Sequence, residues 1–344
     1  MRFLSAGTLL AAAAAVLLKS SPSSANKLAS QAYWPNHPDV VPMKRHIDGE
    51  GGLRTAVVKY KGIDGHLKCT PNVERHYAEI KALEVYDEDF RHIFHYTSFP
   101  TMLGSFPTRD GYHCLVLEPV KGPNLREFMA QQNGRTREKI AAEFAAAAIP
   151  VMMYLHREAI VHGNINPNNI IIRAESVKSS RLQFAFTGFE RSRTVSDQPQ
   201  ASIPGERGYN PPEDYNQSSV DQYRRDVWML GATLYFITNG MPPYGYTKKH
   251  GAIVPVSNKK MLQAMEKAAK TGKRLFPPIN AEHKGLISLM SPLLACKAED
   301  RVGTFTLKDF LSLSDSEPEV KKSFLQNMWI KLRAKLMNNK VSAW

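Results

Sequence analysis

Hydrophobic positions in the first part of the chain follow two different periods. Residues 55–62, TAVVKYKG, form an apolar run with β-branched residues and end at a glycine-containing turn, which predicts a strand. Between residues 72 and 86, apolar side chains recur at helical spacing, which predicts a helix. Shorter strands are predicted near residues 92–97 and 112–120, while residues 26–52 show no period and predict irregular chain. The apolar positions of the predicted helix are Val73, Tyr77, Ile80 and Leu83.

From Thr136 onward the pattern becomes mainly helical. An alanine-rich stretch predicts a long helix that Pro150 kinks, and the apolar residues 226–238 predict a buried helix. Two short apolar segments, 170–172 and 182–186, predict a hairpin, and the polar residues 190–210 predict an exposed loop. A small strand-rich part followed by a larger helical part indicates an α+β fold.

Both ends of the chain carry apolar stretches of their own. Arg2 precedes an alanine- and leucine-rich run from Ala6 to Leu18, and small residues follow it, which is typical of a cleaved signal peptide over residues 1–25. The run is shorter than the roughly 20 apolar residues of a membrane span, so we expect a soluble, secreted chain. Residues 319–344 predict a basic amphipathic helix, which would either lie on a membrane surface or pack on the rest of the protein.

Composition and charge narrow the range of partners. The 344 residues are 43% hydrophobic and 22% charged, as in an ordinary globular protein, and the net charge of +13 favours acidic partners. Lysine and arginine are scattered and do not interleave with aromatic residues, so we expect no nucleic acid. The expected partners are proteins of unknown identity, with peripheral membrane contact only if the C-terminal helix lies on a membrane surface instead of packing on the rest of the protein.

Three cysteines leave two alternatives open. Cys69 and Cys114 could form a disulfide and leave Cys296 free, or all three could be small buried residues. The glycosylation sequon at Asn216 would be used only if the secretory route glycosylates the chain and the loop is exposed.

The segment VHGNINPNN, residues 161–169, holds the candidate chemistry. Taken alone, an asparagine-rich segment with a proline predicts a turn. The segment also resembles the catalytic loop of protein kinases, H-R-D-L-x-x-x-N. In that resemblance His162 stands at the histidine, Asn164 at the catalytic aspartate, and Asn169 at the asparagine that binds metal.

Segments before this loop resemble further protein-kinase motifs in the order of the family. Ala56-Val57-Val58-Lys59 is similar to the V-A-I-K strand, whose lysine contacts the nucleotide phosphates and pairs with a helix glutamate. The resemblance assigns these two roles to Lys59 and Glu79. The segment LVLEPV is similar to the hinge between two lobes, where Glu118 and Val120 would face an adenine.

Segments after the loop continue the same resemblance. Glu213 matches the glutamate of the A-P-E motif, Arg301 the arginine that pairs with it, and Asp226 the aspartate that braces the catalytic loop. The resemblance spans about residues 53–313. It implies a bilobal protein kinase-like fold, with a small β-rich N-lobe lacking the glycine-rich loop at residues 53–119 and a larger α-helical C-lobe at residues 120–318.

Two departures from the family pattern remove charge from the catalytic loop and the metal site. The neutral amide of Asn164 cannot take a proton from a hydroxyl group, and Asn166 replaces the lysine of the loop. The D-F-G triplet aligns with Phe186-Thr187-Gly188, which offers no carboxylate to magnesium. Glu190 or Asp197 would have to substitute from a polar loop.

The third departure concerns the glycine-rich loop. The segment GEGG, residues 49–52, lies too close to Lys59 to leave room for two strands, and it does not complete G-x-G-x-x-G. Retained scaffold residues without catalytic ones predict a pseudokinase, which is no enzyme, has no cofactor and keeps only a vestigial nucleotide cleft. This pattern resembles the secreted With-No-Gly-loop kinases of coccidian parasites, relatives of the rhoptry kinases, which implies export to the parasitophorous vacuole lumen or the cyst wall.

The expected function is therefore that of a secreted, inactive kinase-fold protein that acts as a protein-interaction scaffold. Two alternatives stay open. One is a divergent serine/threonine protein kinase with residual phosphoryl transfer, since this chemistry depends mostly on positioning and electrostatics. The other is an ATP-binding sensor without turnover.

Overall fold

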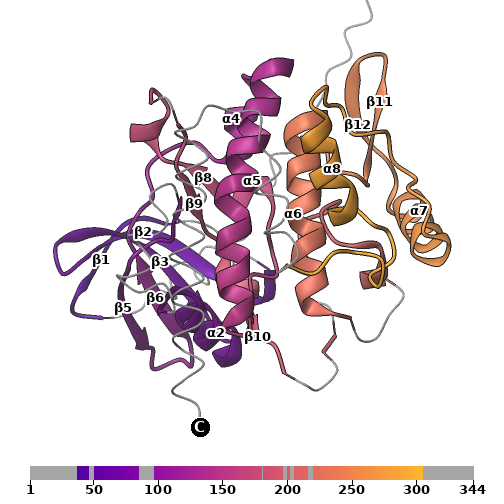
Figure 1. The fold of residues 1–344 in the computed structure, drawn as a ribbon. Helices are drawn as coiled ribbons and strands as arrows, with labels where there is room; N and C mark the ends of the chain where they lie inside the picture. Colours follow the sequence, from indigo (N-terminus) through magenta and orange to yellow (C-terminus); the bar gives the residue numbers. More distant parts are fainter. Residues whose placement is uncertain are drawn as a thin grey trace, which may run out of the picture.

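A five-stranded antiparallel sheet forms the first part of the molecule (Figure 1). The computed structural model describes residues 37–45, 50–84, 97–179, 181–196, 200–201, 205–215 and 220–304. Helices dominate the part after the sheet, so the predicted α+β bilobal fold is confirmed. The strand order is β1-β2-β3-β6-β5, with β1 (Val40–Arg45), β2 (Arg54–Tyr60), β3 (Ile63–Thr70), β5 (Met102–Pro107) and β6 (His113–Leu117).

The sequence pattern misses β1 and β3. Strand β1 lies within the stretch predicted to be irregular, and that prediction is wrong for residues 40–45. The turn between β2 and β3 is at Lys61 and Gly62, which have φ values of 49° and 81°. Every second residue of β3, namely Gly65, Leu67 and Cys69, is then buried, as expected for a strand with one face on a core.

Helix α2 (Val73–Glu84) forms where a helix is predicted, but it buries a different face. Val73 and Tyr77, two of the four apolar positions that predict the helix, are 41% and 61% exposed. The buried side chains include two polar ones, and buried polar groups need partners. The buried face of α2 therefore indicates a functional site rather than a purely apolar core. The buried residues of α2 are His76, Glu79, Ala82 and Leu83.

A disulfide joins β3 to β6. Cys69 and Cys114 are register partners in this antiparallel pair, and their sulfur atoms are 2.04 Å apart. The third cysteine, Cys296, is free and buried. Of the two alternatives left open by the sequence, the structure has the disulfide.

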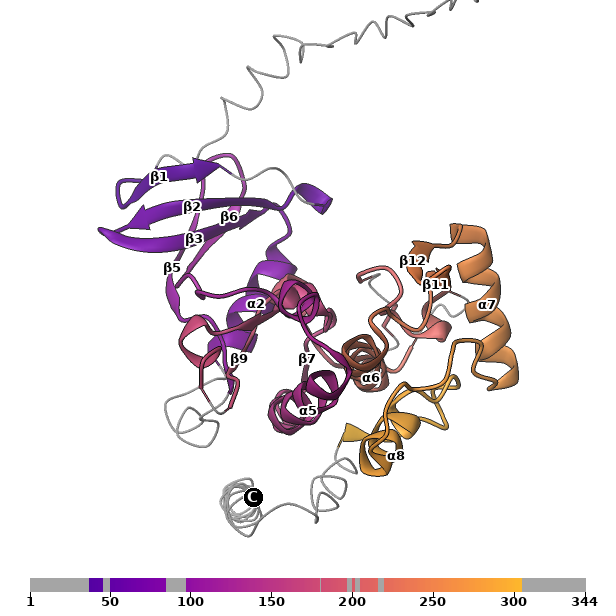
Figure 2. The same cartoon turned by 90° about the horizontal axis from the view of Figure 1, so that it is seen from above.

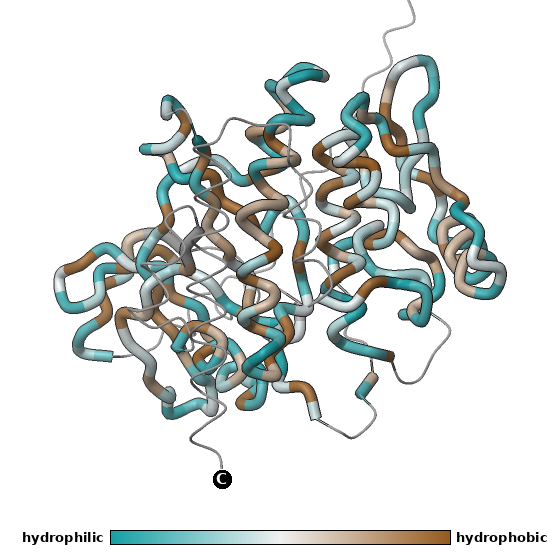
Figure 3. Tube along the Cα trace, in the orientation of Figure 1, coloured by the Kyte–Doolittle hydropathy of each residue, from teal (hydrophilic) through white to brown (hydrophobic). Residues whose placement is uncertain are grey.

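Two long helices form the centre of the second part of the molecule. Helix α5 (Gly134–Arg157) and helix α6 (Gln222–Asn239) lie side by side, and most of their residues are buried (Figures 1 and 2). Figure 3 shows hydrophobic residues along both helices. Pro150 lies inside α5, which continues past it. The surrounding elements are α4 (Leu125–Met129), α7 (Asn258–Thr271), α8 (Lys284–Leu293) and the hairpin of β11 (Tyr246–Lys249) and β12 (Ala252–Pro255).

Short strands between α5 and α6 hold the segments of the candidate site. The predicted hairpin is confirmed as β8 (Ile170–Ile172) and β9 (Phe184–Phe186), with β4 (Thr97–Ser98) added to it. A second pair consists of β7 (Ile160–Val161) and β10 (Arg193–Thr194). The 3-10 turns η2 (Pro167–Asn169) and η4 (Phe189–Arg191) lie between these strands. Residues 162–169 and 187–192 are thus anchored at both ends.

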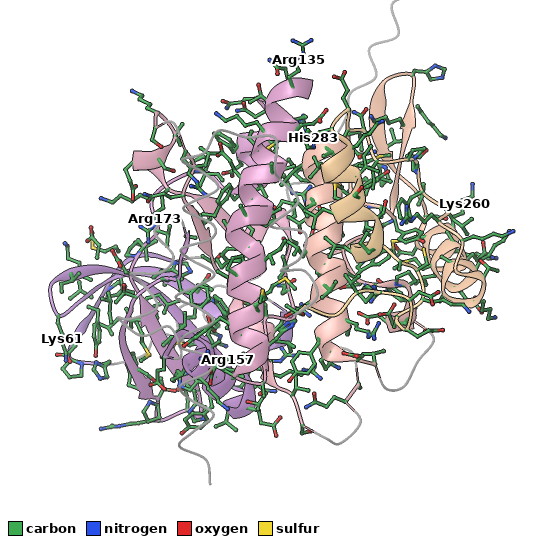
Figure 4. All side chains as sticks on the ribbon, in the orientation of Figure 1. Lys61, Arg135, Arg157, Arg173, Lys260 and His283 are labelled. Carbon is green, nitrogen blue, oxygen red and sulfur yellow. A yellow bond between two sulfur atoms is a disulfide. The ribbon has the colours of Figure 1, made fainter. Side chains whose placement is uncertain are left out.

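Among the described residues, basic side chains lie at several separate places on the molecule. Figure 4 shows Lys61 beside the sheet, Lys260 on α7 at the opposite edge, and Arg135 and Arg157 at the two ends of α5. Within the described ranges, no helix is long and apolar enough to cross a membrane.

Several predicted features lie outside the described residues. These are the signal peptide, Asp197, the sequon at Asn216 and the C-terminal amphipathic helix.

Candidate functional site

A buried aspartate on α6 fixes the start of the loop formed by residues 162–169. Asp226 accepts hydrogen bonds from the backbone N–H groups of His162, at 2.7 Å, and Gly163, at 2.8 Å. Burial opposes its charge, but the hydrogen bond with His156 and the nearby ring of His162 keep the pKa of Asp226 below its usual value. Gly163 has a φ of 74°, and a Cβ there would lie 2.4 Å from the carbonyl oxygen of Arg191, so this position requires glycine.

Three asparagines hold the rest of the loop through their amides. The Nδ2 of Asn166 donates to both the side-chain and the backbone oxygen of Asn164, at 3.0 Å each. The Nδ2 of Asn169 donates to the same backbone oxygen at 2.9 Å. The loop therefore has a defined geometry without charge, and the amide of Asn164 stands where a proton acceptor is expected.

The position of the metal-binding aspartate of the family follows from Asn169. In protein kinases the D-F-G aspartate and the catalytic-loop asparagine hold the metal ions together, so the two positions must be neighbours. The residue against the Asn169 side chain is Gly188, where a Cβ would lie 2.4 Å from the Asn169 amide. The next residue, Phe189, packs on the ring of His162 with 4.5 Å between centroids.

The triplet at the D-F-G position is therefore Gly188-Phe189-Glu190, and the predicted alignment with Phe186 was wrong by two residues. Phe186 lies in β9 and packs on Phe144 in the core, with 6.1 Å between ring centroids. The triplet has a glycine where the family has its metal carboxylate.

A largely buried lysine on β3 pairs with the glutamate of α2. The Nζ of Lys68 lies 2.7 Å from Oε1 of Glu79 and 2.8 Å from Oε2 of Glu190. These three residues, named the Lys68 triad below, have side-chain exposures of 11%, 6% and 23%. They come from β3, α2 and η4, so the triad joins the sheet to the segment that follows β9.

The prediction that Lys59 pairs with Glu79 is wrong. Lys59 lies on β2, its side chain is 44% exposed, and its Nζ is 3.1 Å from the exposed Asp64. Residues Ala56–Lys59 match the V-A-I-K motif, but they lie on β2, whereas the lysine that pairs with Glu79 lies on the next strand, β3. A signal for the right lysine was present, because the alternation of Gly65, Leu67 and Cys69 marks a second strand that carries Lys68.

Charge within the Lys68 triad is strongly coupled. Burial lowers the pKa of Lys68, but the two carboxylates outweigh burial and hold that pKa well above its usual value. Burial also raises the pKa of Glu79, which Lys68 only partly offsets. For Glu190 the attraction of Lys68 prevails over burial and lowers the pKa to about 2. At neutral pH the ammonium of Lys68 and the carboxylate of Glu190 are thus both charged.

A cavity of about 70 Å³ opens beside the triad. Drug-sized ligands occupy pockets of about 300–1,000 Å³, so this cavity would have to widen to admit a nucleotide. Leu53, Lys68, Thr70, Arg75, His76, Glu79, Leu115, Glu190 and Arg191 line it.

Gly51 and Gly52 lie near this cavity, between β1 and β2. The prediction that GEGG is too close to the lysine is therefore wrong. Counting from Lys68, two strands do fit, and Gly51 and Gly52 have φ values of 70° and 79°. A Cβ at Gly51 would lie 3.1 Å from the Arg75 guanidinium. Arg54 stands at the third glycine position of G-x-G-x-x-G. The segment therefore lies where a phosphate-covering loop is expected, but it does not complete the motif.

The hinge residues follow β6 directly. Glu118 is exposed, and its N–H donates to the Thr101 carbonyl at 2.8 Å, while Val120 is half-buried. Just beyond them a Cβ at Gly122 would lie 1.8 Å from the carbonyl oxygen of Ile172. The passage between the lobes is therefore packed closely against β8.

Two buried ion pairs support the segment after the triad. Arg301 contacts both carboxylate oxygens of Glu213, at 2.7 and 3.0 Å, which are the partners that the resemblance assigns. Arg225 contacts Asp214 in the same bidentate manner, at 2.7 and 2.6 Å, and this second pair is missing from the sequence interpretation.

Comparisons with known proteins agree with this geometry. Residues 55–311 match the family described as protein kinase domain. The chain is 27% identical over 186 residues to serine/threonine-protein kinase 36 of Pongo abelii, covering 54% of this chain and 14% of that protein. It is 26% identical over 179 residues to serine/threonine-protein kinase B of Synechocystis sp., covering 50% and 30%. It is 31% identical over 131 residues to serine/threonine-protein kinase PknB of Mycobacterium tuberculosis, covering 38% and 20%.

These comparisons correct the prediction that the chain is no enzyme. The chain matches a catalytic domain family, its relatives are serine/threonine-protein kinases, and it spans less than a third of the length of the three named above. The prediction also used Lys59 as the cleft lysine and treated Glu190 as part of an exposed loop, and the structure places the partly buried Lys68 and Glu190 there instead.

Proposed function

The chain belongs to the protein kinase domain family, and we propose that it is a divergent serine/threonine-protein kinase that transfers a phosphoryl group from a nucleotide to a protein hydroxyl. The observation that carries the proposal is the largely buried contact between Lys68 and Glu79. Such a lysine–glutamate pair must be formed before a protein kinase can transfer a phosphoryl group.

The roles of the residues follow from their geometry. Glu79 holds the Lys68 ammonium at the cavity, where it would contact nucleotide phosphates. Asn164 can accept a hydrogen bond from a substrate hydroxyl, since a carbonyl oxygen has two lone pairs and Asn166 uses one. It orients the hydroxyl but cannot take its proton, so the rate is expected to be lower by about 10²–10⁴ than with a placed general base.

The site is poorly suited to the magnesium ions that the family uses. Position 188 has no carboxylate, and in the part of the chain that is described no group of three or more His, Cys, Asp or Glu residues could hold a metal ion. The usual ligand set therefore does not fit, and we derive no step through a metal. The chain's own residues position the phosphates and the hydroxyl, which is the larger part of this chemistry.

The test compares Lys68→Ala with Lys59→Ala in the full chain. Phosphoryl transfer from labelled ATP to a serine- and threonine-containing protein substrate should be lost in Lys68→Ala, because Lys68 lines the cavity and Lys59 does not. Lys59→Ala is the matched control and should keep the wild-type rate, because its side chain is exposed and distant from Glu79 along the sheet. Equal rates in both variants, or nucleotide binding without any transfer in the wild type, would overturn the proposal.

For the location we propose export through the secretory route to a parasitophorous vacuole or cyst wall. The apolar run of residues 6–18 supports export, and the Cys69–Cys114 disulfide is typical of oxidising compartments. The narrower placement rests on the resemblance to With-No-Gly-loop kinases, including the bradyzoite pseudokinase, and it is weakened by the glycines between β1 and β2. A reporter fused after residue 30 that stays in the cytosol would refute export.

Protein substrates are the proposed partners, with peripheral membrane contact through residues 319–344. That segment combines basic residues with an apolar stripe, which supports contact with an anionic surface. Flotation of the full chain with anionic liposomes should exceed that of a chain ending at residue 318. Equal flotation would assign the stripe to packing within the protein.

A further inference from the structure

A pair of histidines lies where α2 packs on the sheet, on the helix face that also carries Glu79. His76 comes one helical turn before Glu79, is 5% exposed and lines the same cavity as Lys68. Its Nε2 lies 3.0 Å from Oγ of Ser105 on β5. Its ring centroid lies 5.4 Å from that of His113 on β6. His76 therefore connects α2 to β5 and β6 through groups that have no role in the proposed chemistry.

The described groups around His76 favour a neutral ring. Both carboxylates of the cavity, those of Glu79 and Glu190, contact the ammonium of Lys68. A positive charge on His76 would therefore lie beside a second imidazole, near guanidinium groups, while the cavity carboxylates are held by the lysine. The charged or titratable groups that contact His76, line the cavity with it or lie on a strand that packs on α2 are Arg75, Tyr77, Glu79, Lys68, His113, Glu190, Arg191 and Arg193.

The packing of α2 on the sheet is consequently linked to proton binding at His76. Burial and the neighbouring His113 ring lower the pKa of His76 below its usual value. An imidazole that has moved into water binds a proton at its usual pKa of about 6.5. Separation of α2 from β5 and β6 therefore takes up a proton, so the packed state is favoured most above about pH 6.5 and loses stability as the pH falls below that value.

We propose that the contact of His76 with β5 and β6 is a pH-sensitive switch that controls the position of α2. With a neutral ring, α2 stays on the sheet and Glu79 reaches Lys68. With a charged ring, α2 separates from the sheet and takes Glu79 away from Lys68. Because the lysine–glutamate pair must be formed for phosphoryl transfer, mild acid lowers the activity. This effect on activity rests on the proposed function, whereas the movement of α2 does not.

The experiment measures hydrogen exchange of the α2 amides in the full chain between pH 7.5 and 5.5, corrected for the intrinsic pH dependence of exchange. Opening that takes up one proton becomes more favourable by up to about tenfold per pH unit below 6.5. Protection of α2 in the wild type should therefore fall by up to about tenfold between pH 6.5 and 5.5. In His76→Gln it should change little, because the amide does not titrate and can still contact Ser105.

Two controls separate this switch from other effects of acid. His250→Asn removes an exposed histidine from the turn between β11 and β12, where asparagine tolerates the φ of 48°, and should keep the pH dependence of the wild type. Burial also lowers the pKa of His162, so acid destabilises the second lobe as well. The amides of α5 report that loss, and α2 should lose protection before they do.

A further variant keeps the inference testable if His76→Gln does not fold. His113→Gln removes the neighbouring ring but leaves His76 buried, so it should reduce the pH dependence of α2 without abolishing it. A pH dependence that neither variant reduces, or a loss of protection that α5 shows to the same extent, would overturn the inference.

The rate of phosphoryl transfer, measured over the same pH range, separates this inference from the proposed function. A wild type that transfers phosphoryl groups while its α2 protection stays constant with pH refutes only the switch. A wild type in which α2 opens in mild acid, but which transfers no phosphoryl group at any pH, refutes the proposed function and supports the switch.

Discussion

At the residue scale, the neutral amides of Asn164 and Asn166 occupy positions where charge would assist phosphoryl transfer. Asn164, Asn166 and Asn169 satisfy one another by hydrogen bonds, so the loop keeps a fixed shape without Asp or Lys side chains. Buried polar networks are stable when every member is satisfied. The loop thus keeps its geometry but lacks a side chain that can accept a proton.

Restoring that acceptor should raise the rate. In Asn164→Asp the carboxylate can still accept the hydrogen bond from Asn166, so we expect the loop to keep its shape. The rate of phosphoryl transfer at saturating substrate should rise by about 10²-fold, the lower end of what a placed general base contributes. Asn164→Ala, which removes the amide without adding a base, should show no gain. Equal rates in both variants would mean that proton transfer does not limit turnover.

At the element scale, the disulfide between β3 and β6 supports the strand that carries Lys68. Cys69 follows Lys68 directly, and the bond closes a sequence separation of 45 residues. Reduction should lower the free energy of unfolding by about 3–4 kcal/mol on the loop-entropy estimate, measured from urea midpoints. The double variant Cys69→Ser, Cys114→Ser should be insensitive to reductant. An unchanged midpoint after complete reduction of the wild type would contradict the expectation.

Elements with a strong hydrophobic period could be predicted from the sequence, and those with a mixed surface could not. Residues 226–238 and the 170–186 hairpin have clear apolar patterns, and both form as expected. Strand β3 begins with the exposed Ile63 and Asp64, which hides the alternation of its second half. Because this strand was not predicted, the role of the lysine that pairs with Glu79 was assigned to Lys59 instead of Lys68.

Motif matching failed for a related reason at the D-F-G position. Without an aspartate, the sequence offers nothing to fix the register: Phe186-Thr187-Gly188 keeps only the glycine of the triplet, and Gly188-Phe189-Glu190 keeps only its phenylalanine. Only the contact between Gly188 and Asn169 decides between them, and that contact is tertiary. Glu190 was missed because the polar composition of residues 190–210 predicts an exposed loop as a whole. Composition does not show which single side chain of a loop points inward.

At the scale of the whole molecule, a buried ion pair joins distant parts of the second lobe. Arg301 and Glu213 are 88 positions apart, and their side chains are 0% and 2% exposed. The guanidinium also lies over the Trp228 ring, 5.0 Å from its centroid, and donates to the Ala295 carbonyl. The pair thus holds the segment after the candidate site against α6.

Breaking this pair should be costly. Arg301→Met leaves the Glu213 carboxylate buried without its partner, and we expect a loss of about 3–5 kcal/mol in unfolding free energy, measured by urea titration. Lys270→Met breaks the exposed pair with Glu266 and should cost about 0–1 kcal/mol. Similar losses in the two variants would contradict the assigned role of Arg301.

The bond between Cys69 and Cys114 also decides how the protein has to be prepared. Material purified from a reducing cytosol would carry two free thiols on adjacent strands, one of them next to Lys68 along the chain. Thiol-containing buffers, routine in kinase assays, would act in the same way on correctly oxidised material. Activity and nucleotide titrations therefore belong on protein from an oxidising expression route, with the absence of free thiols at residues 69 and 114 checked by mass spectrometry before each experiment.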